Sequence, residues 1–284
     1  MPEGPEVTII AKGLNHLLKG KQIVSWEINT KSRYHKKAPD GYREFNNELS
    51  SIGGLKVKEV ANKGKFIYWT FDNSTVLFQT LGMSGGWFHH DKGNSGIVLT
   101  YLEGKQIKKL YYDDQRRFGT LKFFINPIEA KKQLDKKLSS IGPDLLNDKN
   151  FTKNEFIIRM RKKTLQHKNI TRVITDQKVI SGIGNYLKAE SLYTARINPH
   201  KEVGSITNDE LSELFKAMKS KIIGSYKVGG ASIRHYSDID DVKGTYEFKM
   251  EVYGRKKDIT GRTVIAEKIA GDSQNTYWCP DLQY

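Results

Sequence analysis

The stretch D-Q-K-V-I-S-G-I-G-N-Y-L-K-A-E, residues 176–190, decides the fold of the second half of the chain. Gly182 and Gly184 follow an apolar segment, and residues 187–195 after them have a helical pattern. The pattern predicts two helices on either side of a glycine turn. Glycines let a backbone approach a ligand closely, and amides at the start of the second helix can bind a phosphate. A tight helix–helix turn without a ligand would use the same residues.

The sequence around this stretch is also typical of helices. Residues 207–210 (Thr-Asn-Asp-Glu) fit a capping box. One apolar stripe follows it, consisting of Leu211, Leu214, Phe215, Met218 and Ile222. The polar stretch from Gly230 to Gly244 predicts a functional or mobile loop, and residues 247–284 predict two short hairpins. Helical periodicity begins near Asn126-Pro127, so a linker is expected within residues 126–150.

The first half of the chain has the pattern of an antiparallel β-sandwich. Short apolar or β-branched runs are separated by glycine and Asp-Asn turns. The runs span residues 23–28, 55–60, 65–71, 75–81, 96–102, 107–112 and 119–125. An amphipathic helix precedes them, with its apolar face formed by Val7, Ile10, Leu14, Leu17 and Leu18.

Charge is the most informative feature of the composition. The 284 residues include 47 Lys and Arg against 32 Asp and Glu, which gives a net charge of +15 and a pI near 9.6. This excess predicts binding to a polyanion, most simply nucleic acid, and it favours phosphate as the ligand of the glycine turn. A generally lysine-rich surface would give the same count. The sequence lacks an apolar stretch long enough to span a membrane and a signal peptide, so an intracellular protein is expected.

Pro2 and Glu3 suggest a covalent chemistry at the chain start. Removal of Met1 would leave a secondary amine, and an α-amino group has a pKa of about 8, so a nucleophilic fraction exists near neutral pH. Such an amine forms an imine with an electrophilic carbon, and the Glu3 carboxylate could move protons. A frayed terminus is the alternative. The helix predicted directly after Pro5 would hold the terminus in place and weakens that alternative.

Three motifs of the first half lie at predicted turns or strand ends. Lys65 opens a strand after Gly64, a position at which a lysine is usually only solvated. Met83, and Arg116 with Phe118, fall at turns between strands. Such side chains at exposed tips can wedge between bases, whereas near strand ends they are equally often ordinary core residues.

Together these residues resemble the formamidopyrimidine-DNA glycosylase/endonuclease VIII family of base-excision repair enzymes. The resemblance spans the chain, and three pieces carry it. They are residues 2–7 (P-E-G-P-E-V), residues 176–190 and residues 252–255 (V-Y-G-R). The resemblance implies an α+β multidomain fold with an N-terminal β-sandwich domain at 1–130, a helix-two-turn-helix DNA-binding domain at 131–246 and a β-hairpin finger at 247–284. Double-stranded DNA with oxidised bases or abasic sites is the implied partner of a monomeric enzyme.

The resemblance also implies roles for individual residues. Pro2 would attack C1′ of the damaged nucleotide to form a Schiff base, with Glu3 as the general acid/base. Lys65 and Asn185 would contact phosphates near the lesion, and Glu6 and Glu190 would support the active site. Three residues would fill the void left by the flipped nucleotide, namely Met83, Arg116 and Phe118. The imine at C1′ would acidify the C2′ proton and permit β-elimination and then δ-elimination, which would make the enzyme an AP lyase.

Two departures from the family concern the finger. Only Cys279 of the usual four zinc cysteines is present, with Leu282 at its partner's position, so the resemblance implies a zincless finger without metal or other cofactor. The family's phosphate-binding arginine falls at Gln274, which brings no charge. Either Arg262 or a lysine such as Lys268 replaces it, or lesion binding is weaker.

The lesion preference is ambiguous in the sequence. Residues 229–234 (G-G-A-S-I-R) and the loop to Tyr246 resemble the purine-lesion branch, although Thr171 stands where that branch has a lysine. Residues 185–190 resemble the zincless endonuclease VIII-like branch, which prefers oxidised pyrimidines and ring-opened purines.

The leading hypothesis is a bifunctional glycosylase/AP lyase, and the alternative is a non-catalytic binder of damaged or abasic DNA. An RNA-binding protein would fit the charge but not residues 2–3. The location follows the DNA, in a nucleus, a nucleoid or a viral replication site.

Overall fold

The chain forms two compact units in a computed structural model that describes residues 2–30, 32–93, 95–116, 118–231, 240, 244–269 and 271–284. The N-terminal unit contains Met1–Pro2, Glu6–Ser140 and Gly229–Thr245. The C-terminal unit contains Glu3–Pro5, Ile141–Val228 and Tyr246–Tyr284. The expected boundary at 130/131 falls inside helix α4 (Pro127–Ser140), and the whole helix belongs to the N-terminal unit.

The N-terminal unit is built on one antiparallel sheet. Within the described residues the strand order is β5-β7-β6-β1-β2-β3-β4-β8. The strands are β1 (Gln22–Ile28), β2 (Leu55–Lys63), β3 (Phe66–Phe71), β4 (Val76–Thr80), β5 (Gly85–Phe88), β6 (Ser95–Glu103), β7 (Gln106–Asp114) and β8 (Thr120–Phe124). Its helices are α1 (Gly4–Leu18), α2 (Arg33–Lys36), α3 (Tyr42–Ser51) and α4.

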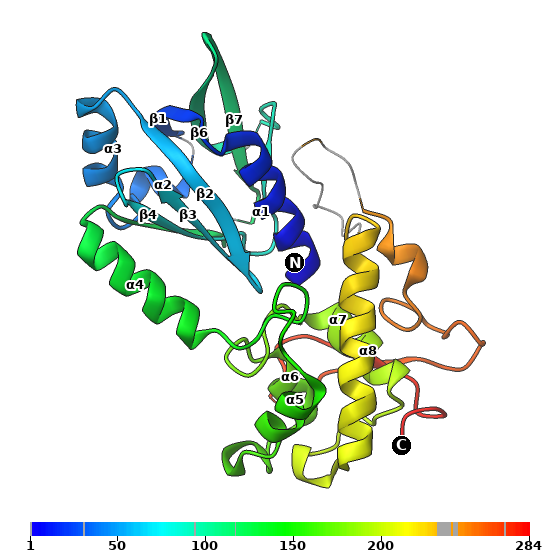
Figure 1. Ribbon diagram of the computed structural model, residues 1–284. Coiled ribbons are helices and arrows are strands. Elements are labelled where there is room, and N and C mark those ends of the chain that lie inside the picture. Colours follow the sequence, from blue (N-terminus) through cyan, green and yellow to red (C-terminus); the bar gives the residue numbers. More distant parts are fainter. Residues whose placement is uncertain are drawn as a thin grey trace. The chain divides into compact units, whose positions relative to one another are not determined.

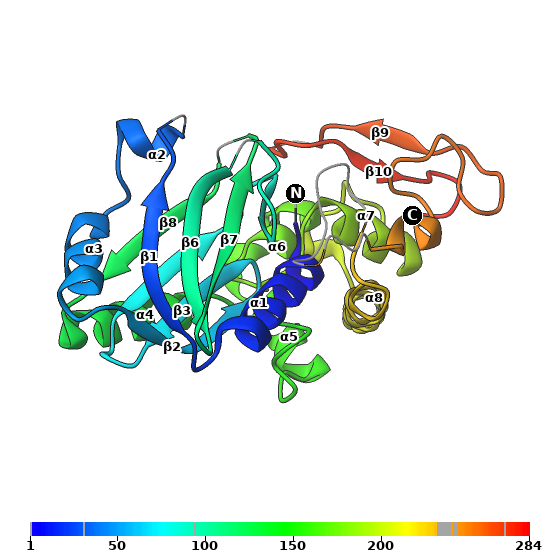
Figure 2. The same ribbon diagram turned by 90° about the horizontal axis from the view of Figure 1, so that it is seen from above.

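The sheet folds over on itself at the β1–β2 junction. These two strands pair at only two positions, Gln22 with Lys56 and Ile23 with Leu55, which leaves the two halves of the sheet free to face each other. Trp26 of β1 lies between them, with its ring centroid 5.7 Å from that of Trp69 and 5.6 Å from that of Trp87. The predicted sandwich is therefore present, with β5, β7, β6 and β1 in one layer and β2, β3, β4 and β8 in the other (Figures 1 and 2).

Several local features differ from the sequence-based expectation. Strand β5 and helices α2 and α3 were not predicted, and helix α4 occupies much of the expected linker. Lys65 lies in the turn between β2 and β3 instead of opening a strand. Of the expected loop after Gly230, residues 232–239 and 241–243 lie outside the described residues.

The C-terminal unit is helical, with a small hairpin at its end (Figure 1). Its helices are α5 (Lys153–Met160), α6 (Ile170–Thr175), α7 (Asn185–Thr194) and α8 (Asn208–Lys227), with 3-10 turns η1 (Lys163–Leu165), η2 (Val203–Ser205) and η3 (Tyr246–Lys249). The predicted capping box at Thr207 and Glu210 is confirmed, and the predicted stripe of α8 is buried. No helix in the described part of the chain has the length and apolar character needed to cross a membrane.

The finger consists of two short hairpins around a small apolar core. Strand β9 (Ile265–Glu267) pairs with β10 (Thr276–Trp278), and a second, minimal hairpin is marked by one bridge between Lys257 and Thr263. Buried Cys279 packs with Val252 and Val264 against helix α7. No group of three or more potential metal ligands occurs among the residues that the structure describes.

Candidate active site

Glu3 is held at the start of helix α7 in the C-terminal unit. Its carboxylate accepts hydrogen bonds from the main-chain N–H groups of Gly184 (2.7 Å), Tyr186 (2.9 Å) and Leu187 (3.3 Å). The side chain is 2% exposed. Three N–H donors and the positive end of the helix dipole stabilise negative charge on this carboxylate. The sequence favoured a phosphate as the ligand of this glycine turn, whereas in the structure its amides bind the protein's own Glu3 carboxylate.

Gln177 fixes the turn that presents these amides. Its side-chain Oε1 accepts a hydrogen bond from the N–H of Gly182 at 2.9 Å, and its Nε2 donates to the carbonyls of Thr175 and Ile183. The N–H of Gly4 donates to the carbonyl of Gly182 at 2.8 Å. These contacts fasten residues 3 and 4 to the turn through main chain and side chain, which argues against a frayed terminus.

Glu6 is anchored within the N-terminal unit. Its Oε1 accepts a hydrogen bond from the N–H of Ala231 at 2.7 Å, and its side chain is fully buried. A Cβ on Gly230 would lie 2.8 Å from the same oxygen, and Gly230 has a φ of +87°. Only glycine suits this position. Glu6 thus fixes the start of residues 229–234, the segment whose sequence resembles the purine-lesion branch.

The two predicted tips of the N-terminal unit lie against each other. Gly82, with a φ of +64°, packs so closely on the following loop that a Cβ would meet the carbonyl carbon of Phe118 at 2.5 Å. Phe118 is 56% exposed, Arg116 is exposed and Met83 is half-buried. The three predicted void-filling residues therefore share one end of this unit, and Phe118 is a surface residue.

A buried carboxylate fastens these two loops together. Asp114 accepts hydrogen bonds from the Ser84 hydroxyl (2.9 Å) and the Gly119 N–H (2.6 Å). The Ser84 oxygen in turn accepts one from the Arg116 N–H. No role was predicted for Ser84 and Asp114, which are separated by 30 positions and meet only because β5 pairs with β7.

We expect Asp114→Ala to loosen this end of the N-terminal unit. The change leaves the Ser84 hydroxyl and the Gly119 amide without their acceptor, at a cost of about 1–3 kcal/mol in the free energy of unfolding. Hydrogen exchange of the Gly119 amide and urea unfolding measure the effect. Asp114→Asn keeps one acceptor oxygen and should cost less; an Ala variant no worse than the Asn variant would contradict this assignment.

Glu190 anchors the beginning of the finger. Its fully buried carboxylate accepts hydrogen bonds from the N–H groups of Glu251, Val252 and Tyr253, each near 2.9–3.1 Å. The Lys221 ammonium lies 3.6 Å away. This arrangement ties the V-Y-G-R segment to helix α7 and so links the finger to the helix whose N-terminus holds Glu3.

Asn185 and Tyr253 lie together at the finger. The Asn185 side-chain amide donates to the carbonyl of Asn275 at 2.9 Å and also shares a hydrogen bond with the Tyr253 hydroxyl. Burial raises the pKa of Tyr253, and the nearby charge of Glu3 adds to the rise. Tyr253 is therefore a neutral hydroxyl beside the site. Its motif was noted in the sequence, but no role was predicted for it.

Gln274 and Arg262 are both exposed, in separate parts of the finger. Arg262 lies 3.8 Å from the Asp258 carboxylate and donates to the Thr260 hydroxyl, so it is engaged within its own turn. The loop that carries Gln274 is anchored by an ion pair between Asp272 and Lys188, whose side chains are 9% and 3% exposed and 2.9 Å apart. This buried pair was not predicted from the sequence.

Asp258 should make the finger sensitive to acid. Burial by itself would raise the pKa of this carboxyl, but hydrogen bonds from Thr260, Arg262 and Tyr193 outweigh it and lower the pKa from 3.8 to about 2. A lowered pKa adds stability that is complete above about pH 4 and disappears as the pH falls toward 2. Asp258→Asn should lose this part of the pH dependence in unfolding measurements. If the free energy of unfolding depends on pH in the same way in the variant and the parent protein, the assignment is contradicted.

Comparison with known proteins places these features in one family. Residues 1–121 match the formamidopyrimidine-DNA glycosylase N-terminal domain, residues 141–237 its H2TH domain and residues 238–284 its C-terminal domain. The chain belongs to the formamidopyrimidine-DNA glycosylase family, whose members are DNA repair enzymes.

Named relatives and solved structures agree with this assignment over the full length. Formamidopyrimidine-DNA glycosylases of Cytobacillus firmus and Listeria monocytogenes are 29% and 28% identical, and each alignment covers 100% of both chains. A Lactococcus lactis FPG variant in complex with DNA that contains Fapy-dG superposes with a TM-score of 0.83 at 25% identity, covering 99% of both chains. The Thermus thermophilus MutM (Fpg) protein gives a TM-score of 0.80 at 25% identity, with 99% of this chain and 98% of that chain covered.

Proposed function

We propose that the protein is a bifunctional DNA glycosylase/AP lyase that removes oxidised bases through Schiff-base chemistry at Pro2. The observation that carries the proposal is the Glu3 carboxylate, held by three main-chain N–H groups next in sequence to the proline. A carboxylate fixed in this way cannot swing away from the residue that precedes it. The residue types match the chemistry: a secondary amine attacks, and an adjacent carboxylate carries protons.

The reaction begins at C1′ of the damaged nucleotide. The Pro2 nitrogen forms a bond to C1′, the bond from C1′ to the base breaks, and the base leaves with a proton. Ring opening gives a positively charged Schiff base, and the Glu3 carboxylate stabilises this charge in a site where water competes poorly. The Schiff base acidifies the C2′ proton. Its removal expels the 3′ phosphate, a second elimination expels the 5′ phosphate, and water releases the proline amine.

The remaining predicted residues have binding roles in this proposal. Lys65, at the β2–β3 turn, and Asn185 contact phosphates near the lesion. Met83, Arg116 and Phe118 fill the void, which fits the exposure of Phe118 and the joint anchoring of their loops through Ser84 and Asp114. Glu6 and Glu190 support the site through the main-chain contacts described above.

Formamidopyrimidine lesions are the first substrates to test. The named relatives are formamidopyrimidine-DNA glycosylases, and the Lactococcus lactis structure contains Fapy-dG. 8-Oxoguanine and oxidised pyrimidines complete the panel because the sequence around residues 185–190 and 229–234 resembles both branches.

Cleavage of a duplex with a single abasic site tests the lyase reaction. The proposal predicts products with both the 3′ and the 5′ phosphate retained on the flanking fragments, the outcome of two eliminations, from protein that has lost Met1. An intact strand would contradict the lyase proposal. Tight binding without cleavage would favour a non-catalytic binder of damaged DNA, the function for which the uncharged, exposed Gln274 is the supporting observation.

A further inference from the structure

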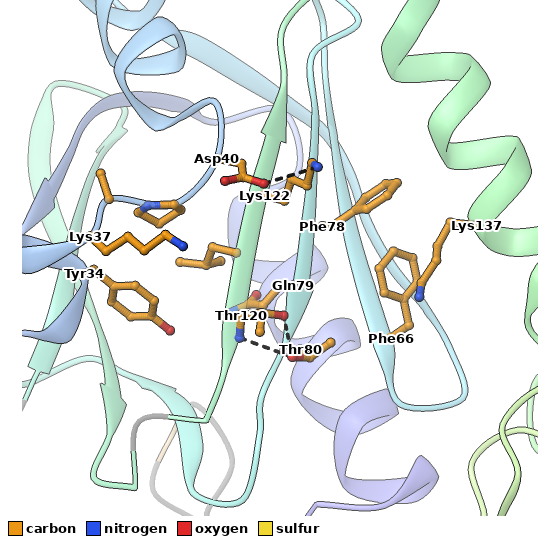
Figure 3. A pocket seen from close by; sticks show the side chains of 13 residues that line it. Tyr34, Lys37, Asp40, Phe66, Phe78, Gln79, Thr80, Thr120, Lys122 and Lys137 are labelled. Atoms are coloured by element: carbon orange, nitrogen blue, oxygen red, sulfur yellow. Dashed lines mark hydrogen bonds and ion pairs between the residues drawn. The ribbon is translucent and has the colours of Figure 1, made fainter.

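A cavity of about 610 Å³ lies on the outer face of strands β3, β4 and β8 in the N-terminal unit (Figure 3). The segment after helix α2 forms one wall, and Lys137 of helix α4 belongs to the opposite wall. The volume is within the usual range of about 300–1,000 Å³ for small-molecule pockets. None of the residues assigned to the proposed chemistry lines this cavity.

Aromatic side chains form the floor on the side of β3 and β4. Phe66 and Phe78 meet edge to face, with ring centroids 4.9 Å apart and planes at 82°. Phe78 is half-buried and so presents part of its surface to the cavity. Phe124 extends this aromatic surface on β8, with its ring centroid 4.8 Å from that of Phe78. Aromatic surface of this kind can serve as a platform on which a nucleic-acid base stacks.

Lysines surround this aromatic floor. Lys37 and Lys137 are exposed and approach from the two walls, and Lys122 rises from β8 between them. The carboxylate of Asp40 lies 3.3 Å from the Lys122 ammonium. Lys37 has no ion-pair partner among the described residues, and Figure 3 shows it directed across the cavity toward β8. Three ammonium groups against one carboxylate leave the cavity attractive to an anion.

The cavity lies next to the two loops that carry the predicted void-filling residues. The hydroxyls of Thr80 and Thr120 are joined by a 2.7 Å hydrogen bond at its rim. Thr80 closes strand β4 shortly before Met83, and Thr120 opens β8 shortly after Phe118. At roughly 3.3 Å per residue, the cavity lies within about 10 Å of chain from both tips.

We propose that this cavity binds an unpaired nucleotide, with its base against Phe66 and Phe78 and its phosphate between Lys37, Lys122 and Lys137. The inference deepens the proposed function, because it adds a second nucleic-acid contact beside the predicted plug. An acidic peptide would use the lysines but not the aromatic floor, and an apolar ligand would use the floor but not the lysines. A nucleotide uses both.

Binding of a labelled oligothymidylate about 12 nucleotides long tests the proposal by fluorescence anisotropy. The pocket variants are K37A/K137A, which removes two exposed ammonium groups, and F78L, which keeps an apolar side chain but removes the ring. The matched control K105A/K108A removes two exposed lysines of the β6–β7 hairpin in the same unit. Each pocket variant should weaken binding about tenfold or more, and the control about twofold.

Two results would overturn the proposal. One is pocket variants that bind like the control. The other is loss of binding in K37A/K137A with F78L unchanged, since that result describes a basic surface without stacking. Competition by free thymidine monophosphate distinguishes a free nucleotide from a nucleotide within a strand as the ligand. If it displaces the oligothymidylate, the cavity also binds free nucleotides. If it does not, the cavity binds a nucleotide only as part of a strand.

Cleavage at saturating duplex concentration separates this inference from the proposed function. The pocket variants should retain the cleavage rate of the parent protein at an abasic site, because none of the changed residues belongs to the chemistry. A parent protein that does not cleave refutes the proposed function but leaves the binding comparison valid.

Discussion

Glu3→Gln should lower the rate of base excision by about 10²–10⁴-fold. The amide cannot accept a proton or balance the positive charge on the Schiff base. Its NH₂ group would also face a main-chain N–H of Gly184 or Tyr186, where the native side chain presents an acceptor. Single-turnover kinetics on a duplex with one formamidopyrimidine lesion measures the effect on chemistry without product release.

Glu155→Gln is the matched control for this variant. Glu155 also accepts a main-chain hydrogen bond at a helix start, from Thr152 at 2.7 Å, but it belongs to the capping box of α5. Its loss should reduce stability by about 1 kcal/mol or less and leave the excision rate within twofold of the parent value. A Glu3→Gln enzyme that stays within tenfold of the parent rate would show that the carboxylate has a structural role only.

Glu190→Ala should strongly destabilise the C-terminal unit. It leaves the buried N–H groups of Glu251, Val252 and Tyr253 without an acceptor and removes a charge that faces Lys221. The expected cost is about 3–5 kcal/mol in the free energy of unfolding, or roughly 10 °C in melting temperature. Thermal unfolding followed by circular dichroism measures it.

Glu213→Ala provides the comparison for Glu190. This residue forms an exposed i,i+3 ion pair with Lys216 on helix α8, and such pairs contribute about 0–1 kcal/mol. Its melting temperature should lie within about 2 °C of the parent value. Equal shifts for the two variants would mean that Glu190 does not anchor the finger.

The elements that were predicted correctly are those marked by the spacing of residues close together in the sequence. The capping box at Thr207 and Glu210 and the apolar stripe of α8 follow directly from residue spacing. Strand β5 was missed because all four of its residues, Gly85 to Phe88, are buried, so the alternation that marks a half-exposed strand is absent. Helix α4 was placed in a linker because its sequence is rich in lysine and other polar residues, and only Ala130 of the helix is buried.

The candidate site also combines features that were visible in the sequence with contacts that form only in the folded chain. The turn at Gly182 and Gly184 and the importance of Glu3 were visible in the sequence, but the contact between them required the folded chain. The Ser84–Asp114 and Lys188–Asp272 pairs join positions far apart in sequence, and nothing local marks either partner. The cavity at Lys37 and Phe78 is likewise assembled from five separate segments.

Borohydride trapping with peptide mass spectrometry would identify the residue that forms the Schiff base. Protein freed of Met1 is mixed with an abasic-site duplex, reduced, digested and analysed for the residue that carries the sugar remnant. The account predicts one adduct, on the nitrogen of Pro2, and no adduct when Met1 is retained. An adduct on a lysine such as Lys65, or none from protein confirmed to begin at Pro2, would contradict it.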